Sequence, residues 1–287
     1  MATFTSTYHR SSYPAIDPTA PQNSMTGRGV LLAGATAGIG LATAHAFLKA
    51  SPAYIVILGR REEGLSAAVA ELESTRPATS TTKIIGMRCD ISNQTHIDKL
   101  WSDLRTDNIP IDVLVLNAAA TTNTRAECLR DMIPFFDMNV VAGLRMADCF
   151  LGQGPPIGKV LINVSSMAAH VTMGDRLKNA AYSASKAAGS AAFQFVADCR
   201  PAEEVQIINV HPGAILTGSA RKAGYDEGTI PWDDGELTLY CIVTPEPLTA
   251  LQLLSRARSS CGRLPSKLRS CMAGSCGVTG TSRSSWP

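Results

Sequence analysis

The chain has 287 residues, 45% of them hydrophobic and 17% charged, which is enough apolar material for one sizeable buried core. Its formal net charge is +2, but residues 251–287 hold six basic residues and no acidic one, leaving 20 basic against 24 acidic residues elsewhere. A slightly acidic body argues against a nucleic-acid surface, and the absence of any apolar run of about 18 residues argues against a membrane span or signal peptide.

Short aliphatic runs alternate with longer helical patterns along the chain. The runs that predict strands are residues 30–33, 54–58, 83–87, 111–116, 159–164 and 205–210. The patterns that predict helices are residues 39–50, 62–74, 94–105, 128–150 and 180–199. Such alternation with continuously apolar strands is typical of βαβ units around a parallel sheet. We predict a single-domain α/β fold, a Rossmann-type doubly wound parallel sheet, that binds ligands at the carboxyl ends of its strands.

A glycine-rich turn follows the first predicted strand, where Gly34-Ala35-Thr36-Ala37-Gly38-Ile39-Gly40 opens directly into a helix. Glycines permit a tight turn and a close approach of backbone to a pyrophosphate, and a helix N-terminus offers unpaired N–H groups to phosphates. The spacing is G-x3-G-x-G and not G-x-G-x-x-G, so an ordinary glycine-rich turn is the alternative. The residues predicted to bind a dinucleotide are Gly34, Thr36, Gly38, Ile39 and Gly40.

Two arginines, Arg60 and Arg61, follow the second predicted strand, where an enzyme selective for NAD often carries an acidic residue. A guanidinium can hold a 2′-phosphate through forked, charge-assisted hydrogen bonds. The pair therefore predicts NADP over NAD, the alternative being two solvated side chains that open the next helix.

Polar residues also end the third and fourth predicted strands. Asp90 can accept a hydrogen bond from an adenine amino group or cap the helix that follows. Asn117 can tie adjacent strands together beside a cofactor.

Tyr182 and Lys186 lie one helical turn apart, and Ser166 lies sixteen residues before the tyrosine. Residues four apart share a helix face, so an ammonium there can stand beside the phenol and lower its pKa by roughly 1 to 3 units. The pattern predicts an acid/base site. A tyrosine and a lysine on an exposed helix face are the alternative.

These motifs together resemble the short-chain dehydrogenase/reductase family, in the family's order and over residues 27–217. The matching residues are Gly34-x3-Gly38-Ile39-Gly40, Asp90, Asn117-Ala118, Asn139, Ser166, Tyr182-x3-Lys186 and Val210-His211-Pro212-Gly213-x3-Thr217. The resemblance implies that Tyr182 is the general acid/base and that Lys186 lowers its pKa and holds the nicotinamide ribose. It further implies that Ser166 polarises the substrate oxygen and that Asn139 orders a water in a proton relay. The residues implied to bracket the nicotinamide are Pro212, Gly213, Ile215 and Thr217.

The activity implied by this resemblance is that of an NADP(H)-dependent oxidoreductase, which interconverts an alcohol and a carbonyl on a small hydrophobic metabolite. Residues 8–18 resemble an N-terminal arm of fungal oxidoreductases, many from secondary metabolism. Relatives of this family are usually homo-oligomers. A dehydratase or epimerase on the same fold, or a catalytically impaired dinucleotide-binding protein, is the alternative.

The predicted organisation is an arm over residues 1–26, a dinucleotide-binding catalytic domain over 27–250 and an atypical tail over 251–287. The tail is rich in Ser, Arg and Cys, and its composition predicts disorder. Back-translation of residues 271–282 in another frame permits H-G-R-F-V-W-x-x-W-D-V, which resembles the family's last strand. We hypothesise a shifted reading frame that begins between residues 232 and 259 and weakens assembly.

The cysteines predict the compartment. Eight are present, none forms a CxxC pair, and no histidine follows His211 to complete a zinc set. We therefore expect free thiols in a reducing cytoplasm, no metal, and a small molecule as the main partner.

Overall fold

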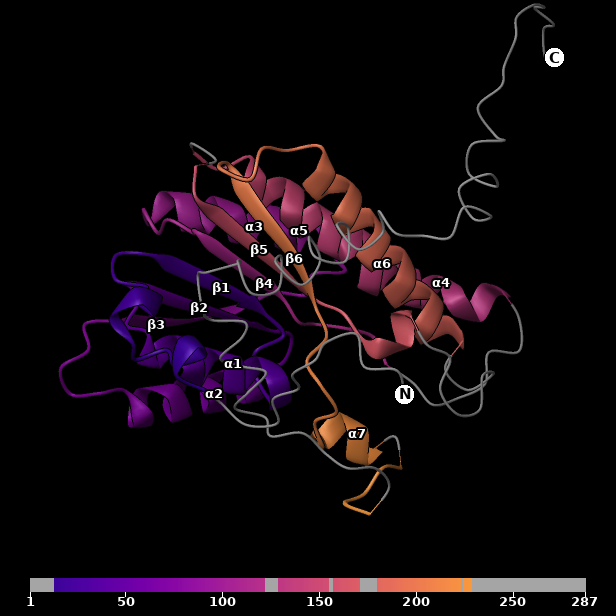
Figure 1. Ribbon diagram of the computed structural model, residues 1–287, viewed down its shortest axis with the longest axis horizontal. Coiled ribbons are helices and arrows are strands. Elements are labelled where there is room, and N and C mark those ends of the chain that lie inside the picture. The colour runs from indigo at the N-terminus through magenta and orange to yellow at the C-terminus, as the bar shows by residue number, and fades with distance from the viewer. Residues whose placement is uncertain (1–12, 122–128, 155–156, 171–179, 223, 229–287) are drawn as a thin grey trace, which may run out of the picture. The chain divides into compact units, whose positions relative to one another are not determined.

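The computed structural model describes residues 13–121, 129–154, 157–170, 180–222 and 224–228 (Figure 1). All of them belong to one compact unit, Thr7–Pro245. The start of the predicted arm and the whole predicted tail, with the proposed frame shift, lie outside the described residues.

Six parallel strands form one sheet in the order β3-β2-β1-β4-β5-β6. The strands are β1 (Gly29–Ala33), β2 (Tyr54–Gly59), β3 (Lys83–Arg88), β4 (Val113–Leu116), β5 (Lys159–Val164) and β6 (Val205–Val210). Every residue of β1, β4 and β5 is buried, which explains the unbroken apolar sequences of β1 and β4 and the largely apolar sequence of β5. The strand order reverses between β1 and β4, where a doubly wound sheet forms its ligand crevice. The predicted fold class is confirmed.

Helices cover both faces of the sheet (Figure 1). One face packs against α1 (Gly38–Lys49) and α2 (Glu62–Thr75). The other packs against α3 (Gln94–Thr106), α5 (Ala142–Leu151) and α6 (Ala180–Asp198). Successive strand residues point to opposite faces, so each strand contributes to both clusters.

The predicted helix over residues 128–150 is interrupted, which corrects the sequence-based expectation. It comprises η3 (Leu129–Met132), α4 (Ile133–Phe136), a π-helical turn η4 (Asp137–Val141) and then α5. Pro134 fits in the first turn of α4, where its missing N–H group has no partner to lose. The π turn carries Asn139, and such single turns are frequent at functional sites.

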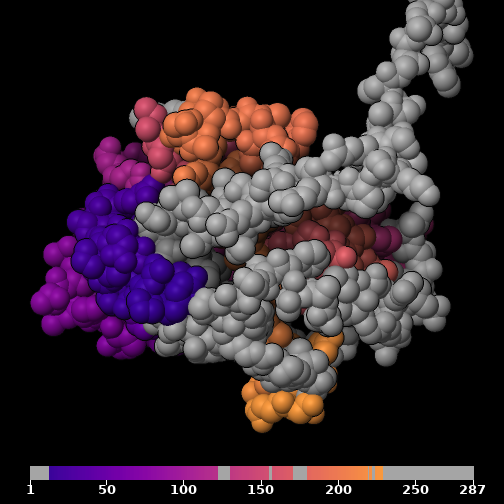
Figure 2. Space-filling model, in the orientation of Figure 1, coloured from indigo at the N-terminus to yellow at the C-terminus, as the bar shows by residue number. Residues whose placement is uncertain are grey.

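The remaining elements are short: η1 (Pro14–Ile16), η2 (Pro21–Asn23), η5 (Met167–Ala169) and α7 (Gly218–Lys222). Ile16 and Met25 are buried, and Asn23 Nδ2 donates to the carbonyls of Ala15 and Asp17. The described part of the arm therefore packs on the domain, in the indigo region of Figure 2. Across the described ranges, none of the helices has the length and apolar character needed to cross a membrane.

Candidate active site

The glycine turn between β1 and α1 has no room for side chains. Gly34 has a φ of +81°, and a Cβ there would lie 2.7 Å from the Cα of Ala118. A Cβ on Gly40 would lie 2.1 Å from the carbonyl oxygen of Gly34. Asn117 Nδ2 donates to this same oxygen at 2.7 Å. Asn117 thus ties the end of β4 to the turn, as the sequence predicts.

The N-terminus of α1 fits a diphosphate. Its N-cap is Ala37, and no side chain caps this end of the helix. The first N–H groups of a helix carry a partial positive charge and lack intrahelical acceptors, so they suit an anion. A Cβ at Gly38 would lie 3.5 Å from Thr217 Cγ2, which places the loop after β6 beside this turn. Ile39, the next residue, packs against the core and is only half-buried.

A methyl group at Gly40 is expected to damage this site. Gly40→Ala should destabilise the fold by about 1 to 3 kcal/mol, the usual range for overpacking, and should weaken dinucleotide binding at least tenfold. Fluorescence titration with NADPH and urea unfolding would measure the two effects. Gly64→Ala is the matched control, because a Cβ at Gly64 meets only Thr36 Cβ at 4.0 Å. Wild-type affinity in Gly40→Ala would contradict the assignment of the turn.

Arginines gather beside the glycine turn, at the carboxyl ends of β2 and β3. Arg60 and Arg61 are exposed, and Arg61 is the N-cap of α2. Arg88 pairs in register with Gly59, and its Nε donates to the carbonyl of Arg60 at 3.2 Å. Sequence reasoning missed Arg88, although pairing the two predicted strands in parallel would have placed it beside Arg60.

Thr36 packs against this arginine segment. A Cβ at Gly59 would lie 2.5 Å from Thr36 Cγ2, so glycine at that position lets the turn approach the end of β2. The predicted phosphate-binding turn and the two predicted arginines are therefore adjacent in space.

Asp90 does not cap the helix after it, which corrects one of the two alternatives. Asn93 is the N-cap of α3, and its side chain accepts from two backbone N–H groups. Asp90 Oδ1 instead accepts from the N and Oγ of Ser92, at 3.0 and 2.7 Å. Burial raises the pKa of Asp90, but the Ser92 hydrogen bonds and the charges of Arg60 and His96 outweigh it, so the pKa lies below its ordinary value. The carboxylate is charged at neutral pH and lies near Arg60.

Asn139 joins the segment after β4 to helix α6. Its Oδ1 accepts from the N–H of Ala120 at 2.7 Å, and its Nδ2 donates to the Ala120 carbonyl at 3.1 Å and to Ser185 Oγ at 2.9 Å. Ser185 Oγ donates in turn to the Tyr182 carbonyl at 2.9 Å. Both amide hydrogens of Asn139 are thus used within the protein. Ser185, which sequence reasoning missed, is three residues after Tyr182 and faces the same buried side.

The main-chain carbonyl of Asn139 faces α6, because a Cβ at Gly189 would lie 2.9 Å from that oxygen. The carboxamide groups are bonded to Ala120 and Ser185, so the carbonyl is the group of Asn139 that faces the helix.

Three predicted catalytic side chains meet at the end of β5. Ser166 follows the strand as the N-cap of η5, and its Oγ accepts from the N–H of Ala168 at 3.2 Å. Its hydroxyl also hydrogen-bonds with the Tyr182 phenol. Lys186 is 6% exposed, its Nζ lies 6.0 Å from the centre of the Tyr182 ring, and it donates to the Val164 carbonyl at 2.8 Å. A hydroxyl pair and a buried amine therefore share one site.

The pKa values differ from the sequence-based expectation. Burial raises the pKa of Tyr182, and the hydrogen bond with Ser166 lowers it by less. Burial also lowers the pKa of Lys186 to about 8. In the chain alone, burial is the largest influence on the pKa of both residues, and the effect of Lys186 on the tyrosine pKa stays a prediction.

The loop after β6 holds the last set of predicted residues. Pro212 is buried, Gly213 has a φ of +78°, and Ile215 is half-buried. Thr217 Oγ1 accepts from the N–H of Ala220 at 3.1 Å, which caps α7. These residues lead the chain from β6 back to the glycine turn.

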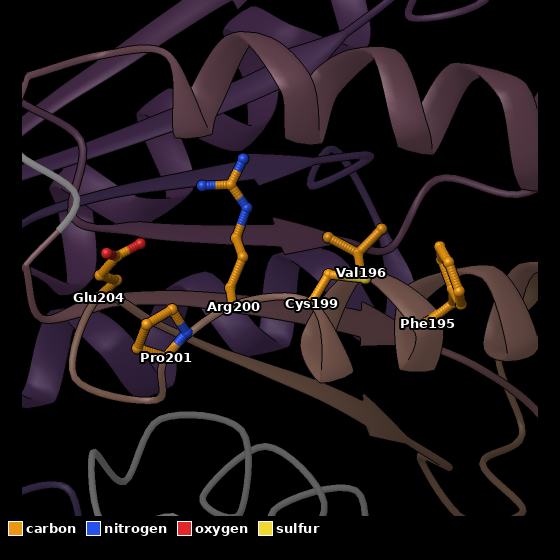
Figure 3. A pocket seen from close by; sticks show the side chains of 6 residues that line it. All are labelled: Phe195, Val196, Cys199, Arg200, Pro201 and Glu204. Carbon is orange, nitrogen blue, oxygen red and sulfur yellow. The ribbon is translucent and has the colours of Figure 1, made fainter.

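A separate depression of about 500 Å³ lies at the far end of α6 (Figure 3). Its lining residues are Phe195, Val196, Cys199, Arg200, Pro201 and Glu204. Glu204 directly precedes β6, so this depression is at the amino ends of the strands, away from Tyr182. Residues 122–128 and 171–179 lie outside the described residues.

The sequence and the fold both have known relatives. A family model described as short chain dehydrogenase matches residues 28–228. The short chain dehydrogenase/reductase AacuD of Aspergillus aculeatus is 32% identical over 237 residues, covering 80% of this chain and 78% of its own. A short chain dehydrogenase/reductase of Claviceps purpurea is 33% identical over 239 residues, covering 81% and 77%.

Two solved structures share the fold. A short-chain type dehydrogenase/reductase from Mycobacterium ulcerans superposes with a TM-score of 0.68 at 20% identity, covering 79% of this chain and 86% of its own. The Pseudomonas aeruginosa RhlG/NADP active-site complex gives 0.64 at 22% identity, covering 78% and 90%. Together with the family model, which spans the whole sheet, these relatives establish that the chain belongs to the short-chain dehydrogenase/reductase family of oxidoreductases.

Proposed function

We propose that the chain is an NADP(H)-dependent oxidoreductase that interconverts a carbonyl and an alcohol on a small, hydrophobic metabolite. The observation that carries this proposal is the hydrogen-bonded pair of hydroxyls, Ser166 and Tyr182, beside the buried amine of Lys186. Hydroxyl donors at one point suit an oxygen on which negative charge develops.

Proton transfer is the part of the reaction that the chain's own residues supply. NADPH, when bound, supplies the hydride that reduces the carbonyl carbon. The raised pKa of Tyr182 keeps its phenol protonated at neutral pH, so it can donate a proton to the carbonyl oxygen while Ser166 donates a hydrogen bond. Lys186, with a pKa of about 8, can then return a proton to the tyrosine, since efficient acid/base groups titrate near the working pH. These values suit proton donation by Tyr182 near pH 7.

The relay behind Lys186 is proposed to include Asn139, acting through its main-chain carbonyl and through the bonds of its side chain to Ala120 and Ser185. Asn139 thereby also positions Tyr182, whose carbonyl accepts from Ser185.

NADP is the proposed cofactor. Its diphosphate would be held by the glycine turn and its 2′-phosphate by Arg60 and Arg61, with Arg88 fixing the backbone between them. Asp90 would accept from the adenine, and Pro212, Gly213, Ile215 and Thr217 would contact the nicotinamide. The NADP complex of a protein with the same fold supports the choice of nucleotide.

The double variant Arg60→Ala/Arg61→Ala is expected to raise KM for NADPH by at least about 100-fold, because each of the two lost charged hydrogen bonds is worth about 1.5 to 3 kcal/mol. KM for NADH should change little, so the ratio of the two constants measures the effect. Arg76→Ala is the control, since Arg76 is at the other end of α2 and pairs with Glu73. A wild-type preference for NADH would contradict the cofactor assignment.

The wider setting is also proposed. We infer a homo-oligomeric enzyme of the cytoplasm that acts in fungal secondary metabolism, supported by the resemblance of residues 8–18 and by the fungal relatives. The proposed domain is residues 27–250, of which the family model covers 28–228.

A further inference from the structure

Strands β5 and β6 are held together as far as Ser165, the residue before the catalytic serine. Asn163 pairs in register with Asn209, and Val164 with Val210. The N–H of Ser165 donates to the Val210 carbonyl at 2.7 Å, which is the last backbone bond between these two segments among the described residues. Backbone pairing therefore stops one residue short of Ser166.

Buried polar side chains reinforce these strand ends and attach them to α6. Asn163 Nδ2 donates to Asn209 Oδ1 at 2.7 Å, and Asn209 Nδ2 donates to the Ser190 carbonyl at 3.0 Å. The hydroxyls of Ser165 and Ser190 are 2.6 Å apart. Asn163, Ser165 and Ser190 are at most 7% exposed, so this buried network fixes the end of β5 that directly precedes Ser166.

After Ser165, a side chain and not the backbone of the neighbouring segment accepts the next backbone hydrogen bond. Alternate residues of a strand hydrogen-bond to the same neighbouring strand, so the N–H of Met167 is the next donor after that of Ser165. It donates to Nδ1 of His211 at 3.1 Å. His211 directly follows β6 and begins the loop that holds Pro212 and Gly213. An imidazole therefore joins the turn after β5 to the loop after β6.

We propose that His211 is a positioning residue, whose imidazole holds Ser166 in place relative to the loop assigned to the nicotinamide. Met167 follows Ser166 directly, so movement of its N–H group moves the serine. This role rests on the proposed function. It requires Nδ1 to be an acceptor, with the ring proton on Nε2. A misplacement of about 1 Å at a reacting group can lower turnover about a hundredfold. Loss of the single hydrogen bond from Met167 to His211 can therefore have a large effect on turnover.

His211→Leu and His211→Asn separate this role from simple packing. Leucine removes the acceptor, whereas asparagine keeps an acceptor oxygen at the δ1 position. We expect kcat with NADPH to fall by about 10- to 100-fold in His211→Leu and to recover to within about threefold of wild type in His211→Asn, with KM for the carbonyl changed less than kcat. His170→Leu is the control: this exposed histidine ends η5 and joins Met167 through its backbone N–H. Equal loss in both His211 variants would overturn the role of the acceptor.

Hydrogen exchange of the Met167 amide tests the same inference without turnover. NMR with labelled methionine should show slow exchange in the wild type and in His211→Asn, and fast exchange in His211→Leu. NADPH should slow this exchange further in the wild type but not in His211→Leu, because the imidazole connects the turn that carries Met167 to the loop assigned to the nicotinamide.

The two experiments distinguish failure of this inference from failure of the proposed function. Equal exchange at Met167 in the wild type and His211→Leu would overturn the inference, and so would wild-type kcat in His211→Leu. A wild type that binds NADPH and shows the expected exchange pattern, yet reduces no carbonyl, would instead overturn the proposed reaction and, with it, the catalytic purpose of His211.

Discussion

Tyr182→Phe is expected to bind NADPH like the wild type and to lose at least about a hundredfold in turnover. General acid catalysis by a positioned side chain contributes typically about 10²- to 10⁴-fold, and Tyr182 is the proposed proton donor. The ring is retained, so its packing in the largely buried site should be retained as well. Steady-state kcat with NADPH and a reducible ketone, beside fluorescence titration of NADPH, would measure both properties.

Tyr54→Phe is the matched control for this variant. Tyr54 begins β2, at the opposite end of the sheet, and Lys83 Nζ lies 5.6 Å from its ring centre. Loss of that hydroxyl should leave kcat unchanged. If Tyr182→Phe kept kcat within tenfold of the wild type, Tyr182 would not be the proton donor.

Lys186→Met is expected to remove most turnover. Its free energy of unfolding should exceed that of the wild type, and by more at pH 7 than at higher pH. Burial lowers the pKa of Lys186 to about 8 from 10.5. Between about pH 8 and pH 10.5, Lys186 is protonated in the unfolded protein and deprotonated in the folded protein. The unfolded state therefore binds more protons, and wild-type stability rises with pH through this window.

The stability difference between Lys186→Met and the wild type should consequently depend on pH. The penalty for charging the buried amine is fully present below pH 8 and disappears as pH approaches 10.5. From pH 7 to pH 9.5 the advantage of the methionine variant should shrink by about 2 kcal/mol. Urea unfolding of both proteins at the two pH values would measure it.

Lys99→Met is the control, because Lys99 is exposed and pairs with Asp103 at 2.7 Å. Its stability difference from the wild type should be nearly constant over the same pH range. A constant or growing advantage of Lys186→Met would show that the buried amine does not titrate near pH 8.

The strands could be predicted closely because both faces of the sheet are covered. The run at residues 113–116 is buried at every position, so its sequence is continuously apolar. The interrupted helix before β5 could not be predicted in the same way. Its π turn places Asn139 against Ala120 and Ser185, and these are tertiary contacts that leave no periodic pattern in the sequence.

The site residues could be located from order and spacing, but their electrostatics could not. The sequence places Tyr182 and Lys186 on one helix face, and the structure brings both to Ser166. It does not reveal that burial raises the pKa of Tyr182 and lowers that of Lys186, since desolvation depends on residues packed from other elements. The contacts of Arg88 and His211 likewise arise from strand pairing and from the chain path after β6.

Transfer of a deuterium label from NADPH tests the central claim most directly. The wild type would be incubated with candidate carbonyl metabolites and NADPH deuterated at C4 of the nicotinamide, on the transferred face, and the products would be analysed by mass spectrometry. The proposed reaction predicts an alcohol that carries one deuterium on carbon and one solvent proton on oxygen, formed with one equivalent of NADP⁺ and absent with Tyr182→Phe. Tight binding of NADPH without any deuterated alcohol, across carbonyls of varied size, would contradict it.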